Sequence, residues 1–131
     1  MPRYLYEKRY TPPAPVLPLR VGRPGAEPEV FLSALVDTGA DISVLPQGLP
    51  GRLGLPAVDR VSISGVDSLP HSLPVYAAEV AVNGYRTLIR AVSLGATPLI
   101  GRDLLNKLTL RLLGPEAILE VDFPPSASRS P

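Results

Sequence analysis

The sequence predicts a single domain built almost entirely of β-strands. Seventeen prolines and 11 glycines divide its 131 residues into short segments. These segments are either wholly apolar or alternate apolar and polar residues, which is the pattern of strands, and helical periodicity is scarce. The length suits one domain, and a hydrophobic content of 45% is enough for a modest core.

The first half of the chain is expected to hold four strands. Residues 16–21 (VLPLRV) form the first, and residues 30–36 (VFLSALV) the second. Because nearly every residue of the second strand is apolar, we expect both of its faces to be buried. Residues 42–46 (ISVLP) form a short third strand. A loop at 47–56, with three glycines and two prolines, leads to an alternating strand at 60–66 (RVSISGV).

A long hairpin follows in the second half. After a turn at 67–72, residues 73–82 (LPVYAAEVAV) form the longest expected strand, and residues 85–93 (YRTLIRAVS) return beside it. Asn83 and Gly84 stand between the two. An Asn-Gly pair between apolar runs is a strong signal for a two-residue hairpin turn, because both residues tolerate positive φ.

The C-terminal part holds the best helix candidate, residues 102–108 (RDLLNKL). Strands at 108–113 and 117–123 form a terminal hairpin around Gly-Pro-Glu. We therefore expect three segments along the chain. They are an extended N-terminal arm at 1–15, a folded domain at 16–123 and a disordered tail at 124–131.

Composition and charge exclude several classes of function. The 13 basic and 12 acidic residues are scattered and leave a net charge of +1, so we expect no nucleic-acid or membrane partner. The chain has no cysteine and only one histidine, His71, which argues against a zinc site. No apolar run reaches the roughly 18 residues of a membrane span. The start, MPRYLYEKRYTPP, lacks the apolar centre of a signal peptide, so we expect a cytoplasmic protein.

The stretch LVDTGADISVLP, residues 35–46, places a carboxylate directly after a buried strand. Burying Asp37 is costly unless its carboxylate is hydrogen-bonded or shares a proton. Gly39 permits a tight turn. Two carboxylates that share one proton can act as base and acid in the same step, which suits the activation of a water. A plain structural turn is the alternative interpretation of the tripeptide Asp-Thr-Gly alone, because Asp is favoured at turns.

A second signal, PLIGRDLL at residues 98–105, favours the catalytic interpretation. LVDTGADISVLP followed by LIGRDLL resembles the retropepsins, the single-domain aspartic proteases of retroviruses and their cellular relatives. SISGVDSL at 62–69 stands where that family has its flap, and the resemblance covers residues 16–123. It implies an all-β acid-protease fold, a closed β-barrel-like single domain with one short helix near the C-terminus.

The resemblance assigns the catalytic role to Asp37. Since the chain carries one such motif and no internal duplicate, the second aspartate is expected from another copy, which makes the active form a homodimer. Thr38 matches the residue whose hydroxyl binds the partner subunit's backbone beneath the two aspartates. Gly39 matches the glycine whose carbonyl faces the substrate main chain. Asp41 and Arg102 match a pair of residues that form an ion pair behind the site. Exposed surface charges are the alternative for these two.

The resemblance also implies how a substrate is bound. Leu35, Thr97 and Leu99 match side-chain pockets, although ordinary core packing also requires apolar residues. Gly65, Val66 and Asp67 match the tip of the flap, which holds an extended peptide as an added strand. The expected substrate-binding residues are thus Leu35, Gly39, Ala40, Asp41, Gly65, Val66, Asp67, Thr97 and Leu99.

The sequence departs from the family at two places. Only Gly65 is glycine at the flap tip, so we expect a stiffer or differently shaped flap. Ala40 stands where pepsin-like enzymes have a serine, so we expect a pH optimum closer to neutral than that of pepsin. The expected function is hydrolysis of polypeptides without a metal or cofactor. The alternative is an inactive dimer of the same fold that binds peptides or serves in assembly.

Overall fold

The structure, a computed structural model, describes residues 1–64 and 69–125. Ten strands and three short helical segments build it, which confirms the prediction of an all-β chain. In chain order they are β1 (Arg3–Leu5), β2 (Val16–Gly22), β3 (Val30–Val36), β4 (Ser43–Leu45), α1 (Leu49–Leu53), β5 (Ala57–Ser64), β6 (Pro70–Val82), β7 (Tyr85–Ser93), β8 (Leu99–Ile100), α2 (Arg102–Leu105), β9 (Thr109–Leu113), the 3₁₀ turn η1 (Gly114–Glu116) and β10 (Ile118–Asp122).

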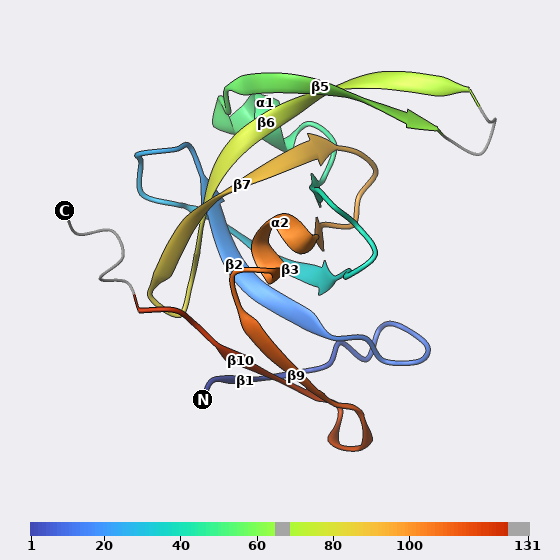
Figure 1. Ribbon diagram of the computed structural model, residues 1–131, viewed down its shortest axis with the longest axis vertical. Helices are drawn as coiled ribbons and strands as arrows, with labels where there is room; N and C mark the ends of the chain where they lie inside the picture. Colours follow the sequence, from blue (N-terminus) through green and yellow to red (C-terminus); the bar gives the residue numbers. More distant parts are fainter. Residues whose placement is uncertain (65–68, 126–131) are drawn as a thin grey trace.

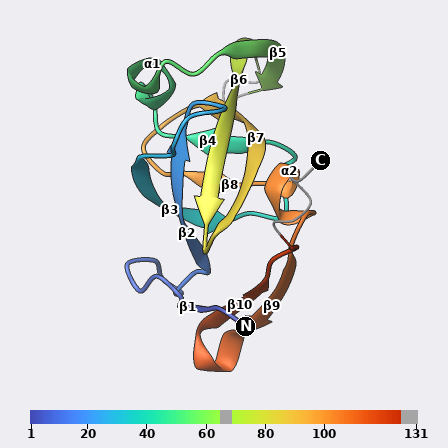
Figure 2. The ribbon, with the colours of Figure 1, turned by 90° about the vertical axis from the view of Figure 1, so that its left-hand side faces the viewer.

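The strands form one large and one small sheet. The large sheet has the order β2-β3-β8-β4-β7-β6-β5, and an additional pairing of β2 with β6 closes six of its strands into a ring. The small sheet has the order β1-β10-β9 and lies below the ring in Figures 1 and 2. The hairpin of β5 and β6 extends from the opposite end of the molecule (Figure 1).

The core fills the ring and continues to the small sheet. Strand residues reach it by alternation, since every second side chain points inward. Its fully buried members include Leu17, Val21, Leu45, Val80, Ile89, Ile100, Leu104 and Leu119. Leu119 comes from β10, so the small sheet shares the main core rather than forming a separate unit.

Most strand predictions are confirmed. β2, β3 and β7 begin where they were expected, and the turn between β6 and β7 has Asn83 at φ 50° and Gly84 at φ 82°. The burial prediction for β3 is wrong. Its even-numbered residues pack on the core, whereas Phe31 on the other face is 63% exposed. In a ring sheet only the inner face reaches the core.

Three local predictions need correction. The loop predicted at 47–56 contains helix α1, because Pro50 stands in its first turn and Gly48 and Gly54 flank it with positive φ. Pro and Gly at these positions delimit a helix rather than exclude one. The predicted turn at 67–72 ends early, because β6 already begins at Pro70. The predicted helix at 102–108 is shorter, since α2 ends at Leu105 and β9 begins at Thr109.

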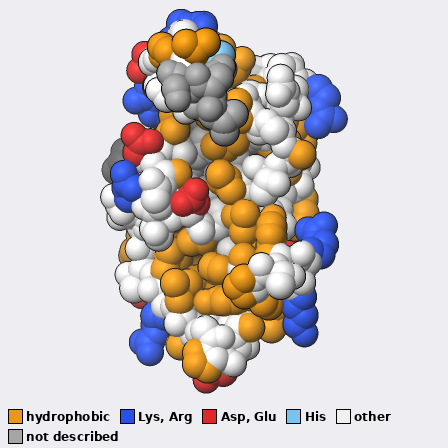
Figure 3. Space-filling view, turned by 90° about the vertical axis from the view of Figure 1, so that its right-hand side faces the viewer, with side chains coloured by type: hydrophobic (Ala, Val, Ile, Leu, Met, Phe, Trp, Pro, Cys, Tyr) orange, Lys and Arg blue, Asp and Glu red, His pale blue; other side chains and the backbone are white. Residues whose placement is uncertain are grey.

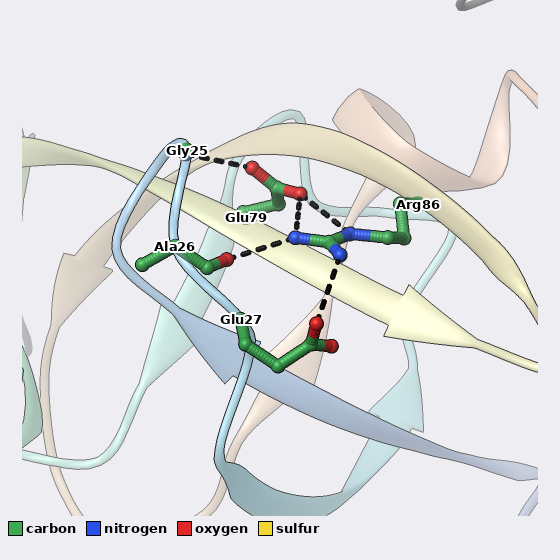
Figure 4. A network of polar contacts seen from close by, with 5 residues as sticks. All are labelled: Gly25, Ala26, Glu27, Glu79 and Arg86. Carbon is green, nitrogen blue, oxygen red and sulfur yellow. Dashed lines mark hydrogen bonds and ion pairs between the residues drawn. The ribbon is translucent and has the colours of Figure 1, made fainter.

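The loop between β2 and β3 is fixed to the β6–β7 hairpin by a polar network (Figure 4). The Arg86 guanidinium donates to Glu79 over 2.7 Å and to the Ala26 carbonyl over 2.8 Å, and it lies 3.4 Å from a Glu27 oxygen. Glu79 in turn accepts the Gly25 N–H over 2.9 Å. These contacts order a loop that has little apolar surface of its own to bury.

The expected flap corresponds to the hairpin of β5 and β6, whose described residues pair from Ala57 with Tyr76 to Ser64 with Pro70. The expected flap-tip residues Gly65, Val66 and Asp67 lie outside the described residues. Within the described part of the chain, no helix has the length and apolar character that a membrane crossing requires.

Candidate active site

The two sequence signals meet because their strands are neighbours. β3 and β8 pair in parallel, with Leu35 beside Leu99 and Val36 beside Ile100. Parallel strands end at the same edge, so Asp37 after β3 and Gly101 after β8 lie next to each other. β4, which follows the Asp37 motif, pairs with the other side of β8. The strands before and after the motif therefore enclose the second motif.

Asp37 begins a tight turn that we call the Asp37 turn, residues 37–42. Its backbone N–H donates to the Ile100 carbonyl over 3.0 Å, which fixes the start of the turn to β8. The Gly39 N–H donates to Asp37 Oδ1 over 3.0 Å, and the Ala40 N–H donates to the Asp37 carbonyl over 3.2 Å. The Asp37 side chain is half-buried. The turn's own backbone thus holds one oxygen of this carboxylate, and among the described residues the other oxygen accepts no hydrogen bond.

The segment after β8 supports this turn from behind. The Arg102 N–H donates to the Ala40 carbonyl over 2.8 Å, and the Arg102 guanidinium donates to the Thr38 carbonyl over 2.7 Å. The expected ion pair between Arg102 and Asp41 is not among the ion pairs of residues 1–64 and 69–125. The guanidinium binds a backbone carbonyl instead, so Arg102 still supports the turn, whereas the Asp41 side chain is exposed.

Gly101 permits close contact between this segment and the turn. A Cβ atom at this position would lie 2.8 Å from the Ala40 carbonyl oxygen and 2.9 Å from the Ile42 carbonyl oxygen. A side chain there would force the backbone of the turn to shift, so packing favours glycine. Its φ of −96° is one that any residue adopts.

Behind the turn lies a polar pair that sequence reasoning missed. Ser43, fully buried, accepts the Gly101 N–H over 3.1 Å and donates its hydroxyl to Asp103 Oδ1 over 2.8 Å. Asp103 Oδ2 accepts the Arg90 N–H over 3.1 Å. Burial raises the pKa of Asp103 against the opposing effect of the Ser43 hydrogen bond. The available sequence signal was weak, since Asp103 lies three positions after the last residue of β8 and within the segment already singled out around Arg102.

A cavity of about 620 Å³ opens between the Asp37 turn and β5. Its lining includes Asp41 and Ile42 from the turn and Val61 and Ile63 from β5. On its wall Arg90 Nη2 forms an ion pair with Asp59 Oδ2 over 2.6 Å. The Arg60 backbone N–H, and second the Arg90 guanidinium, hold the pKa of Asp59 below its ordinary value.

The other expected pocket residues lie around the paired ends of β3 and β8. Leu35 and Leu99 are opposite each other and half-buried, and Thr97 is exposed. Thr97 lines a second cavity, of about 310 Å³, with Arg9, Tyr10, Ser33, Ala96 and Pro98. The N-terminal segment therefore reaches this side of the site. In the described ranges, no three His, Cys, Asp or Glu residues are grouped so that they could hold a metal ion.

Comparisons with known proteins concern the family and the fold of this chain. The sequence profile of the family described as retroviral aspartyl protease matches residues 12–113. No curated protein matches the chain in sequence. Among solved structures, a retropepsin-like aspartic protease from Rickettsia conorii is similar, with a TM-score of 0.58 and 16% identity over 90% of this chain and 88% of that one. The EIAV protease in complex with the inhibitor HBY-793 has a TM-score of 0.52 and 22% identity over 71% of this chain and 86% of that one.

Proposed function

The chain belongs to the retroviral aspartyl protease family, and we propose that it is an aspartic endopeptidase whose active form is a homodimer. The observation that carries the proposal is the Asp37 turn. It presents one half-buried carboxylate, oriented by the Gly39 N–H, beside the end of β8. A water between two such carboxylates can be activated, and one chain supplies only one. A second copy related by a two-fold axis supplies the other.

The proposed reaction is hydrolysis of a peptide bond by that water. The ionised Asp37 takes a proton from the water while its oxygen attacks the carbonyl carbon. The protonated Asp37 of the second copy donates its proton to the carbonyl oxygen, which gives a tetrahedral intermediate. The Asp37 that took the proton from the water donates it to the nitrogen, and the C–N bond breaks. As it breaks, one hydroxyl of the intermediate returns its proton to the second Asp37 and leaves a carboxylic acid product. Both aspartates end in the protonation states from which a new cycle can begin.

Two features of the surface support a dimer at this site. Figure 3 looks at the side of the molecule toward which the β3 and β5 arrows point in Figure 1, and hydrophobic side chains gather across its centre and lower part. Large exposed apolar areas of this kind mark interaction sites. Within the described chain the exposed Thr38 hydroxyl makes no hydrogen bond, so it is available to a partner's backbone.

The proposed substrate is an extended polypeptide that lies between the Asp37 turn and the β5–β6 hairpin. The cavity beside Asp41 and Ile42 has apolar walls on β5 and could hold one of its side chains. Leu35, Thr97 and Leu99 would border neighbouring side chains. Gly39 and Ala40 would contact the main chain, as would Gly65, Val66 and Asp67 of the expected flap tip.

Cleavage of an unstructured protein such as casein between about pH 3 and about pH 8 tests the activity. Wild type should cleave and be inhibited by pepstatin, and Asp37→Asn should be inactive. The matched control is Asp122→Asn, the same exchange at an exposed position on β10, which should cleave like wild type. Equal cleavage by wild type and Asp37→Asn would refute the protease. Binding of peptides without cleavage by a dimeric wild type would favour the inactive module.

A mixing experiment tests the shared site. If chains exchange freely, an equimolar mixture of wild type and Asp37→Asn places roughly half of the wild-type chains in mixed dimers. Such dimers have one functional aspartate, so activity should fall to about half of that expected from the wild-type content. Activity proportional to wild-type content would show that each chain works alone. Sedimentation of the mixture at the assay concentration would verify that dimers are present.

A further inference from the structure

Asp103 takes part in hydrogen bonds behind the Asp37 turn, and the proposed reaction gives it no role. One carboxylate oxygen accepts the Ser43 hydroxyl over 2.8 Å, and the other accepts the Arg90 N–H over 3.1 Å. Ser43 in turn accepts the Gly101 N–H over 3.1 Å. A single half-buried carboxylate thus joins β4, β7 and the first turn of α2.

The direction of these hydrogen bonds requires a carboxylate. The Ser43 hydroxyl accepts from Gly101 and must donate elsewhere, and the Arg90 N–H can only donate, so both need an acceptor on Asp103. An ionised carboxylate accepts at both oxygens, whereas an amide or a protonated acid presents one donor. Asparagine at position 103 has nearly the same shape, but it would leave one of these two donors without an acceptor.

The two ends of this network lie on either side of the expected substrate. Through Ser43 and Gly101 it reaches the Asp37 turn, because Gly101 packs so closely on the turn that an added Cβ atom would lie 2.8 Å from the Ala40 carbonyl oxygen and 2.9 Å from the Ile42 carbonyl oxygen. Through Arg90 it reaches β5 of the flap hairpin, because the Arg90 guanidinium pairs with Asp59 over 2.6 Å. Asp103 therefore connects the element that carries the catalytic carboxylate to the element that covers the substrate.

We propose that Asp103 is a positioning residue that holds the Asp37 turn in its catalytic geometry through Ser43 and Gly101. The inference rests on the proposed function, since it concerns the same reaction. Asp103 does not touch the scissile bond in this scheme. It acts by fixing the backbone from which Asp37 projects, and a small displacement of a reacting group lowers the rate steeply.

The burial of Asp103 sets the pH dependence of this role, and three other charged groups lie near it. The Arg90 guanidinium, Asp59 and Asp41 line the same cavity as Asp103. Burial raises the pKa of Asp103, so protonation, which removes one acceptor, occurs at a higher pH than in an exposed aspartate. Wild type and Asp103→Asn should therefore differ most near neutral pH and converge in acid, where both have a neutral group.

The test compares kcat per active site, counted by titration with a tight-binding inhibitor, for wild type, Asp103→Asn and Asp122→Asn. We expect about a tenfold lower kcat for Asp103→Asn at about pH 7, with KM little changed, and a difference that narrows toward about pH 4. Asp122→Asn should match wild type. A purely structural role would lower the number of active sites but leave kcat per site unchanged.

Ser43→Ala provides a second route if Asp103→Asn folds poorly, because it removes the same link and keeps the carboxylate. It should lower kcat per site by a similar factor, and the double variant should be no slower than the slower single variant. Wild-type kcat per site in either single variant would overturn the inference while leaving the protease intact. A wild type no more active than Asp37→Asn would remove both proposals, so the two failures are distinguishable.

Discussion

Replacing Gly101 by alanine should disturb the Asp37 turn through one methyl group. The backbone at Gly101 is extended, with φ −96° and ψ −170°, so alanine suffers no conformational strain there. The effect is purely steric. The new Cβ would lie 2.8 Å and 2.9 Å from the carbonyl oxygens of Ala40 and Ile42, and 3.0 Å from the Ile42 carbonyl carbon. All three atoms belong to the Asp37 turn.

The size of the effect follows from these distances. Ordinary contacts begin at 3.4 Å, so the turn and the methyl group must separate by roughly half an ångström. Both partners are backbone, which cannot rotate away as a side chain would. Overpacking of this kind costs about 1–3 kcal/mol in the free energy of unfolding. For a chain of this size, that lowers Tm by about 3–15 °C. A shift of this size at Asp37 should lower kcat about tenfold.

Thermal unfolding and cleavage of an unstructured substrate measure both consequences. Gly51→Ala is the matched control, because Gly51 lies in helix α1 and a Cβ there meets no atom within 4 Å. Alanine should stabilise that helix by up to about 1 kcal/mol and leave kcat unchanged. A Gly101→Ala variant with the Tm and kcat of wild type would refute the conclusion that the two motifs require direct backbone contact.

Three further predictions concern stability. Gly84→Ala should lower the free energy of unfolding, measured in urea, by about 1–2 kcal/mol, because Gly84 has φ 82° in the β6–β7 turn. An unchanged urea midpoint would contradict this. Arg86→Met should lower the free energy of unfolding by about 1–3 kcal/mol and speed tryptic cleavage at Arg23, since the loop loses its hydrogen bond from Arg86 to the Ala26 carbonyl and Glu79 loses its cation. Equal cleavage rates would argue against the network. Burial raises the pKa of Asp103 in the folded chain above its pKa in the unfolded chain. As the pH falls from the folded-state pKa to the unfolded-state pKa, the folded chain takes up the proton first, and the free-energy cost of burying the charge disappears. The free energy of unfolding of wild type relative to Asp103→Asn should therefore rise between about pH 7 and about pH 4, and a falling difference would reverse the assigned cause.

Local patterns predicted the strands well because alternation and turn chemistry are properties of short segments. β7 matched its predicted bounds, and Asn83 with Gly84 formed the expected turn. The same reasoning failed where one residue type serves two purposes. Glycine and proline in the predicted loop at 47–56 delimit α1, and an apolar run in β3 has one outward face that includes Phe31.

The structure brings some of the candidate site residues together and leaves others apart. The sequence identified Asp37 and the segment around Arg102 as one functional unit, and the parallel pairing of β3 with β8 brings them together. Among the described residues the Arg102 guanidinium donates to the Thr38 carbonyl and forms no ion pair with Asp41, because side-chain partners depend on distances that sequence spacing does not define. Asp103 and Ser43 were overlooked for the same reason, since their contact spans 60 positions of the chain.

The sequence by itself determined the strand pattern, the turn that presents Asp37 and the family to which the chain belongs. Periodicity, turn residues and a buried acid are all encoded within a few neighbouring positions. Only the tertiary structure decided which groups support that acid. The pairing of β8 with β3 and β4 brings Gly101 against the Asp37 turn, and the pairing of β4 with β7 allows Asp103 to lie between Ser43 and Arg90. Such contacts arise when distant segments are packed into one core, where close approach and the direction of each hydrogen bond are decided in three dimensions.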